Sequence, residues 1–233
     1  MQTTSVAIAS LAALFLSPAA RAADDEKLER IDKSREVLHE FIGMPEGIPR
    51  DLVDKAECLA VIPSSKKFAF GVGATFGKGV LVCRKDDGRG RWGAPLMLHT
   101  EGGSFGLQVG GQSADVVLLI MNRKGVDKLL ESKLTLGADA SVAAGPVGRK
   151  AAAATDVQMH AEILSYSRSR GVFAGVSLEG ASLRPDKDAN ERLYGAQVNP
   201  RAVVLEGTKT VPPQARALVD TLQSLAPTHV SRN

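Results

Sequence analysis

Three short motifs in this sequence carry residues that could perform chemistry. The first, Gly148-Arg149-Lys150, looks like the end of a loop that cradles a phosphate. Such a loop follows G-x-x-x-x-G-K-[ST], because its backbone N–H groups close on the phosphates while the hydroxyl reaches a metal ion. Ala143, Arg149 and Lys150 stand where that pattern requires glycine, lysine and a hydroxyl residue. The segment therefore predicts no nucleotide site.

The other two motifs place a serine where a nucleophile could stand. The stretch "GGSFG" matches G-x-S-x-G at Ser104, and Asp139 and His160 follow in the order of a hydrolase triad. That nucleophile needs a turn from a strand into a helix, whereas the residues after Ser104 continue a strand. The stretch "SSKK" from Ser64 matches S-x-x-K, but neither S-D-N nor K-T-G follows it. We therefore expect a protein that is not an enzyme.

The histidines and the acids within predicted strands show no spacing typical of a metal site. Asp115, Asp139 and Glu179 lie among apolar or small residues, where a carboxylate either lines a cavity or accepts hydrogen bonds that stabilise the fold. The structural role is favoured, and we expect no metal and no cofactor. The four histidines are His39, His99, His160 and His229.

Basic residues gather at the predicted strand ends and turns. By the two-residue period of a strand, Arg168 and Arg170 share one face. If several of these ends meet at one rim, they form an anion-binding surface that suits phosphate headgroups. Ordinary solvated charge is the alternative that composition alone favours. The candidate lipid-binding residues are Lys66, Lys67, Arg149, Lys150, Arg168 and Arg170.

A helix is predicted to precede the strands. Residues 24–43 place apolar side chains at helical spacing, and Gly43 ends the pattern. The polar face of this helix mixes both signs and leans acidic, whereas a helix that binds anionic membranes carries Lys and Arg there. We expect the helix to pack on its own domain. Its apolar residues are Leu28, Ile31, Leu38, Phe41 and Ile42.

The period then changes to two. In residues 66–79 the even positions are mostly bulky and the odd positions mostly small, and residues 101–111 and 134–145 repeat this split. Strands of this kind are half-buried and more often antiparallel than parallel. Glycine weakens a strand interior, so its repetition indicates strong bending or close approach by another backbone. The pattern predicts an α+β fold: a strongly bent, barrel-like antiparallel sheet with N- and C-terminal helices packed on it.

The rest of the chain is predicted to alternate between strands and short helices. Residues 114–122 are apolar on both faces, as in a central covered strand. Thr135 to Ala144 is predicted to form one strand, with Gly145 to Arg149 as its turn. Further strands are predicted within 155–169 and 171–185. One short helix is predicted to begin at Pro49. The others are predicted at 123–132, 186–195 and 211–225.

The first 22 residues predict a secretory signal peptide. The apolar run from Val6 to Leu16 is too short to span a bilayer and is followed by the A-x-A pattern of Ala20 to Ala22. The first residues carry no Lys or Arg, unlike most such signals. Neither cysteine lies near the expected cleavage site after Ala22, so no thiol there could carry a lipid. We therefore expect a periplasmic or secreted protein.

Net charge and chain length limit the possible partners and the number of domains. Without residues 1–22 the chain keeps 28 Lys and Arg against 26 Asp and Glu. This balance predicts no nucleic-acid partner, which would require a strongly basic patch. We expect a signal peptide at 1–22, an amphipathic helix at 23–48, a single domain at 49–226 and a frayed tail at 227–233.

The two cysteines, Cys58 and Cys83, have two readings. In an exported chain they could form a disulfide, which suits an oxidising compartment. The alternative is a pair of buried free thiols on strands, because free cysteine packs like a small apolar residue. The sequence leaves both readings open, since it cannot show that the two Cα atoms lie within bonding distance.

Four stretches, taken in order, closely resemble the SYLF domain family: "GVGATFGKGVLVCR", "GAPLMLHTEGGSFGLQVGGQSADVVLLIMN", "KLTLGADASVAAGPVGR" and "LSYSRSRGVFAGVSLEGASLRPD". The resemblance covers Pro49 to Gly195. Eukaryotic members bind phosphoinositides and other acidic lipids, some bind or bundle actin, and bacterial members are exported. The resemblance therefore implies a non-enzymatic domain whose partner is an anionic phospholipid membrane. The alternative is a periplasmic carrier or envelope scaffold that binds an apolar ligand or a protein partner.

Overall fold

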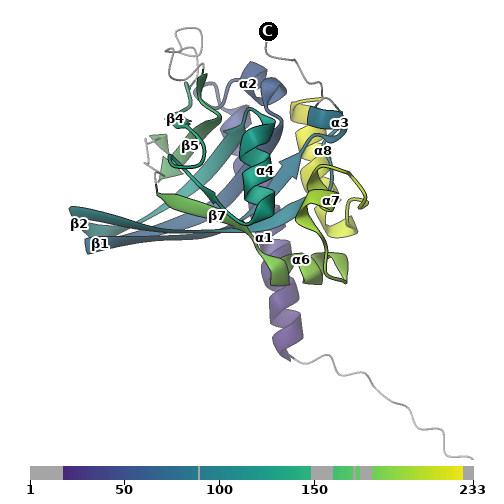
Figure 1. The fold of residues 1–233 in the computed structure, drawn as a ribbon, viewed down its shortest axis with the longest axis horizontal. Helices are drawn as coiled ribbons and strands as arrows, with labels where there is room; N and C mark the ends of the chain where they lie inside the picture. Colours follow the sequence, from purple (N-terminus) through teal and green to yellow (C-terminus); the bar gives the residue numbers. More distant parts are fainter. Residues whose placement is uncertain (1–17, 89, 148–159, 170–171, 174–179, 228–233) are drawn as a thin grey trace, which may run out of the picture.

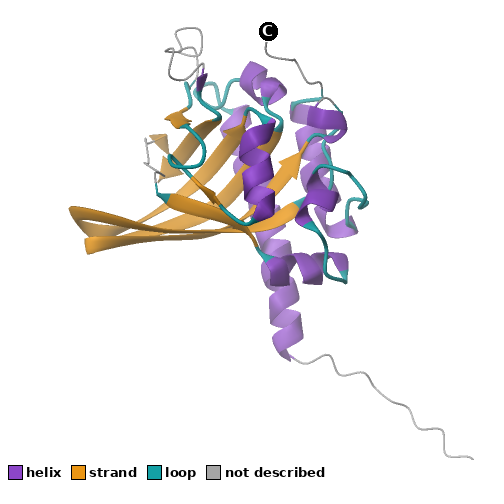
Figure 2. Ribbon diagram, viewed as in Figure 1, coloured by secondary structure: helices purple, strands orange, loops and turns teal. Residues whose placement is uncertain are grey.

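The computed structural model describes residues 18–88, 90–147, 160–169, 172–173 and 180–227. Its described part forms a strongly bent, seven-stranded sheet with helices on both faces (Figures 1 and 2). In chain order the elements are α1 (Pro18–Gly43), α2 (Arg50–Lys55), β1 (Cys58–Cys83), α3 (Lys85–Gly88), β2 (Leu96–Ile120), α4 (Arg123–Glu131), β3 (Leu134–Thr135), β4 (Val142–Ala144), β5 (Ile163–Ser169), β6 (Val172–Phe173), β7 (Ala181–Pro185), α6 (Lys187–Tyr194), α7 (Pro200–Val204), the 3-10 helix η2 (Pro213–Ala215) and α8 (Arg216–Leu225). The predicted α+β class with a bent sheet is confirmed. One pairing departs from it, because β4 runs parallel to β5.

The long strands β1 and β2 dominate the sheet. They pair antiparallel from Cys58 opposite Ile120 to Leu81 opposite Leu96, whereas a typical strand has about 5–6 residues. Figure 1 shows the middle of this pair projecting from the body as a ribbon. The second half of β1 returns over the first, since a Cβ atom built on Gly77 would lie 2.6 Å from Cγ2 of Ile62. β1 therefore doubles back on itself, and β2 follows it by pairing.

Glycines allow the two halves of β1 to approach each other. A Cβ atom on Gly79 would lie 2.3 Å from the carbonyl oxygen of Val61, closer than a real Cβ atom comes to backbone. The bare face predicted from the alternation is thus the inner face of the bend, as the repeated glycines indicated. Bulky side chains point outward instead: Phe68 is 56% exposed and Phe76 is 55% exposed.

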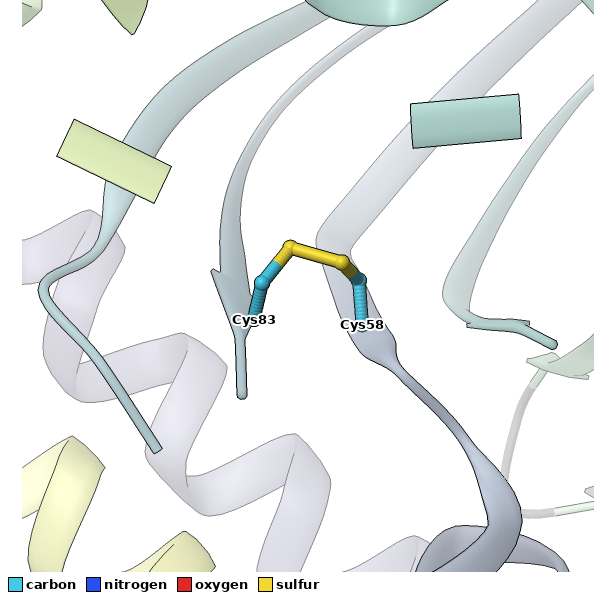
Figure 3. The surroundings of a disulfide bond; sticks show 2 residues. All are labelled: Cys58 and Cys83. Carbon is cyan, nitrogen blue, oxygen red and sulfur yellow. A yellow bond between two sulfur atoms is a disulfide. The ribbon is translucent and has the colours of Figure 1, made fainter. Parts of the chain in front are cut away.

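A disulfide joins the two ends of β1 (Figure 3). Cys58 and Cys83 are 25 residues apart in sequence, yet their Cα atoms lie 4.0 Å apart. Both residues are buried in the core on the inner side of the bend. Of the two states that the sequence left open, the structure contains the bridge, which closes the doubled strand at the end away from the ribbon.

Two hydrophobic cores cover the two faces of the sheet. Val117 and Leu119 of β2 contribute to the core beneath α1, α2, α6 and α8, whereas their neighbours along the strand face α4 and α7. The prediction of a strand covered on both faces is confirmed. The prediction that the first helix packs on its own domain is also confirmed, although Leu28 is 37% exposed. The residues of α1 in this core include Ile31, Leu38, Phe41 and Ile42.

Side-chain caps define the helices that follow β2. Asn122 accepts a hydrogen bond from the N–H of Gly125 at the start of α4, and Asp186 accepts one from Ala189 at the start of α6. Both helices, as well as α2 and α8, match predicted helices. The short helices α3 and α7 lie outside the predictions. α7 does carry a recognisable start signal, because Asn199 caps it and Pro200 occupies its first position.

The prediction of one strand from Thr135 to Ala144 is wrong. β3 ends at Thr135, a turn occupies 137–139, and β4 begins at Val142. Gly137 has φ of 85°, a left-handed conformation that glycine adopts without a steric penalty. The carboxylate of Asp139 accepts the N–H of Thr135 at 2.8 Å, and this bond is the main cause of the lowered pKa of Asp139. An acid that the alternation assigned to a strand therefore stabilises a turn.

The strands predicted within 155–169 and 171–185 are described only in part, because residues 155–159, 171 and 174–179 lie outside the described residues. β5 begins at Ile163, because Glu162 before it exchanges hydrogen bonds with Ser141 at 3.0 Å in each direction. Within 171–185 the structure describes β6 and β7. Gly180, with φ of 81°, turns the chain into β7.

Candidate functional site

The structure places the predicted basic residues in different surroundings. Lys66 and Lys67 lie on the first half of β1, where Lys66 is exposed and Lys67 is partly buried. Arg168 lies on β5, opposite Asp115 of β2. The remaining three predicted residues lie outside the described residues: Arg149, Lys150 and Arg170.

Arg168 contacts two carboxylates, so its charge is matched within the fold. Its Nη2 forms an ion pair with Glu40 near the end of α1 and lies 4.0 Å from an oxygen of Asp115. The guanidinium also lies 5.4 Å from the centre of the Phe41 ring, and its side chain is only 11% exposed. Arg168 therefore fastens β5 to α1. Asp115 has a structural role as well, because it accepts the N–H of Ser64 at 2.8 Å.

A cleft of about 610 Å³ lies between α1 and the doubled strand β1. This volume is within the usual range for small-ligand pockets, about 300–1,000 Å³. The cleft depends on the bend, because residues from both halves of β1 line it together with residues of α1 and β2. Side chains that matter for its chemistry are Arg30 and Lys33 of α1, Lys66, Phe76 and Lys78 of β1, and His99 and Glu101 of β2.

The cleft carries more positive than negative charge. Four Lys or Arg residues line it, against two carboxylates. Glu29 accepts a hydrogen bond from Lys33 at 2.6 Å, and this bond raises the pKa of Lys33. Glu101 pairs with Arg184 at 3.0 Å. Lys66 forms no ion pair with the residues that the structure describes, so its charge is available to a ligand.

A buried ion pair fixes α1 beside the cleft. The side chain of Arg30 is 5% exposed, and its Nη1 lies 2.9 Å from an oxygen of Asp186. Burial acts to raise the pKa of Asp186, but the hydrogen bonds from Ala189 and Arg30 outweigh it and hold the pKa below its ordinary value. The charge of Arg30 is thus matched inside the fold. Its role is to position α1 beside the cleft.

The serine motifs lie within strands. Ser104 lies inside β2, where it pairs with Gly73 of β1, away from any turn into a helix. Ser64 lies at an irregularity in β1 and has φ of 49°. The S-x-x-K match therefore falls on a locally distorted strand. Among the residues that the structure describes, no group of three or more His, Cys, Asp or Glu could hold a metal ion.

Sequence reasoning identified Lys66 and missed the rest of the cleft. Lys33 lies on the mixed-charge face of a helix, and Phe76 lies on the bulky face of a strand, so neither pattern points to a shared site. Lys78 follows Phe76 with the two-residue period of one strand face, and this spacing is a signal that could have found it. The bend in β1 is what brings these residues together.

Comparison with known proteins gives a single family. A family model described as "Ysc84: Las17-binding protein actin regulator" matches residues 101–225, more than half of the chain. Protein YSC84 of Saccharomyces cerevisiae is 34% identical over 203 residues, which cover 83% of this chain and 42% of that protein. SH3 domain-containing YSC84-like protein 1 of Homo sapiens is 34% identical over 200 residues, which cover 82% of this chain and 57% of that protein.

The matched region can be located on the fold. The chain spans about half the length of the curated relatives it matches. In the described part of the chain, no helix combines the length and the apolar character needed to cross a membrane. The matched region runs from β2 of the bent strand pair to α8. Three of the four sequence stretches noted above fall wholly or largely within it, and the first, residues 71–84, precedes it. The chain belongs to the Ysc84 family and contains its SYLF domain.

Proposed function

We propose that this chain is a non-enzymatic domain that binds anionic membrane surfaces and holds lipid headgroups in the cleft between α1 and β1. The surplus of positive charge in that cleft carries the proposal. Lys66 and Lys78 stand on the two halves of β1, and Lys33 stands on α1. Near an anionic surface each lysine contributes on the order of 1 kcal/mol. The exposed ring of Phe76 adds apolar surface beside them.

This proposal moves the site from a rim of strand ends to the cleft. Lys66 belongs to both versions of the site. Arg168 does not, because its charge is matched by Glu40 and Asp115. The sequence resemblance to lipid-binding SYLF domains supports the lipid, and the geometry of the cleft supports the residues. The roles of the predicted residues outside the described part of the chain stay predictions.

We further propose that the protein is exported. The apolar run from Val6 to Leu16 and the A-x-A pattern support a cleavable signal. The disulfide between Cys58 and Cys83 supports it independently, because disulfides persist mainly in oxidising compartments. α1 begins at Pro18, so cleavage after Ala22 would remove only its first residues. Mass spectrometry of the protein from the envelope fraction is expected to find Ala23 first, and an intact Met1 would contradict export.

Reversing two cleft charges is expected to weaken membrane binding by more than tenfold. Lys66→Glu/Lys78→Glu removes two attractions of about 1 kcal/mol each and adds two repulsions. Cosedimentation with phosphatidylcholine vesicles, with and without phosphatidylserine or a phosphoinositide, measures the effect. Wild-type binding is expected to fall as salt rises, because charges are screened over about 8 Å at physiological ionic strength. Lys124→Glu/Lys133→Glu is the matched control, since these exposed lysines lie on and after α4, outside the cleft.

Two results would contradict this proposal at different levels. Equal weakening by both double variants would show that net charge, and not the cleft, determines binding. A wild-type protein that ignores anionic vesicles would exclude the lipid function. The second candidate, a carrier or envelope scaffold, would then apply. Phe76 and Pro63 give the cleft apolar surface for a carried ligand, and the family description as Las17-binding favours a protein partner.

A further inference from the structure

We propose that the projecting ribbon of β1 and β2 inserts its tip at the boundary between the headgroups and the acyl chains of the membrane. The inference rests on the proposed function and adds the element that enters the bilayer. We define the ribbon tip as residues 68–76 of β1 and 102–111 of β2, which face each other from Phe68–Gly111 to Thr75–Gly102. These residues include no Asp, Glu, Lys, Arg or His. Figure 1 shows this end of the ribbon standing clear of the body.

The described side chains of the ribbon tip present phenyl rings to the outside. Phe68 and Phe76 are both more than half exposed, although large apolar side chains are usually buried. On the inner face, Ile62 and Thr100 fill the space beside Gly77, the neighbour of Phe76. The stacking of the two halves of β1 therefore leaves the ring of Phe76 on the outside. An exposed apolar surface of this kind typically marks an interaction site.

The charges around the ribbon tip match a bilayer. Lys66 and Lys67 directly precede Phe68, and Lys78 follows Phe76 by two residues. An uncharged tip with exposed phenyl rings and lysines at its base complements an acyl layer that lies behind anionic headgroups. Glu101, opposite Phe76, does not oppose this arrangement, because Arg184 matches its charge at 3.0 Å.

The length of the ribbon tip fits shallow insertion. From Lys66 to the irregularity near Gly71 the strand rises about 16 Å, at about 3.3 Å per residue. One headgroup layer is about 5–8 Å thick, so lysines at the phosphate level leave the tip able to reach the acyl boundary. Pairing between β1 and β2 satisfies one edge of each strand. Their other edges would leave polar backbone groups unpaired in hydrocarbon, which limits the depth.

Tryptophan reporters can locate the inserted element. The native Trp92 is 3% exposed and donates its indole N–H to the carbonyl of Ala226, so the wild type supplies the background. Phe68→Trp and Phe76→Trp report on the ribbon tip, and Leu28→Trp reports on an exposed position of α1. The vesicles contain phosphatidylserine and a phosphatidylcholine brominated near the start of its acyl chains. Binding is expected to quench and blue-shift both tip reporters and to leave Leu28→Trp unchanged.

The outcomes separate this inference from the proposed function. Vesicle-bound protein in which Leu28→Trp is quenched and the tip reporters are not would assign insertion to α1 and overturn the inference alone. Bound protein with no quenched reporter would also overturn it alone. Absence of binding would overturn both proposals. As an affinity test, Phe68→Ser/Phe76→Ser is expected to weaken binding tenfold or more at high salt, where the apolar contribution remains. Leu28→Ser is its matched control, and equal affinities of the two variants would contradict insertion by the tip.

Discussion

Replacing Cys58 and Cys83 by alanine is expected to lower the free energy of unfolding by about 3.5 kcal/mol. The disulfide restricts the unfolded chain over a separation of 25 residues, and loop-closure entropy for that length gives about this value. Urea unfolding followed by circular dichroism measures the difference. Both cysteines are buried in the core shared with Ile62 and Leu81, so a small loss of packing adds to the effect.

Chemical reduction provides the control for this prediction. Wild-type protein in strong reductant is expected to approach the stability of the double alanine variant, whereas the variant itself does not respond to reductant. The comparison separates the covalent link from the packing of the two side chains. A reduced wild type that unfolds at the same urea concentration as the oxidised form would show that the bridge adds nothing to stability.

Gly79→Ala is expected to cost about 3 kcal/mol of unfolding free energy or to prevent folding. The added Cβ atom would lie 2.3 Å from the carbonyl oxygen of Val61 and 2.9 Å from Cγ1 of Ile62. The first contact is with backbone, so relief requires the two halves of β1 to separate, a cost at or above the upper end of that for ordinary overpacking. Thermal and urea unfolding measure it.

A second glycine of the ribbon serves as the matched control. A Cβ atom on Gly103 would come no closer than 3.9 Å to any neighbour, the carbonyl oxygen of Gly73. Gly103→Ala is therefore expected to change the stability by about 0.5 kcal/mol or less. If the two variants unfold alike, the halves of β1 are not in close contact, and the cleft between α1 and β1 would lose its basis.

The repeated glycines made the bend predictable but not the face that it buries. Residues 66–79 show one bulky and one bare face, and the glycines indicate close approach by backbone. An isolated strand usually buries its bulky face. Here the stacked halves of β1 bury the bare face, because Gly77 meets Ile62. No local pattern encodes that contact between two parts of one strand.

The errors in local structure have local causes. The two-residue alternation over 134–145 is compatible with a strand. However, the carboxylate of Asp139 accepts the N–H of Thr135, and this hydrogen bond favours a turn with Gly137 at positive φ. Side chains such as Asp compete with strand hydrogen bonds in this way. The small residues of the segment leave the choice open, and the hydrogen bonds of β4 with β5 complete it.

A residue of the candidate site could be predicted from the sequence only where its basic charge was enough to identify it. Lys66 is basic, exposed and close to a bend, so the sequence could select it. Arg168 looks the same in sequence, yet Glu40 of α1 and Asp115 of β2 match its charge. Glu40 itself lies on a helix face that reads as solvated. Distinguishing an available cation from a matched one requires the packing of α1 against the sheet.

The continuous pairing of β1 with β2 also sets an order for the folding of the chain. Leu81 and Leu96 are separated by 15 residues, whereas Cys58 and Ile120 are separated by 62. Closing the shorter loop loses less chain entropy, so pairing is expected to start beside α3 and to proceed through the ribbon tip toward Cys58. Pairings this distant in sequence slow folding. We therefore expect the turn at the ribbon tip to form before the last steps of folding. Until it forms, the two halves of β1 cannot stack and Cys58 cannot reach Cys83.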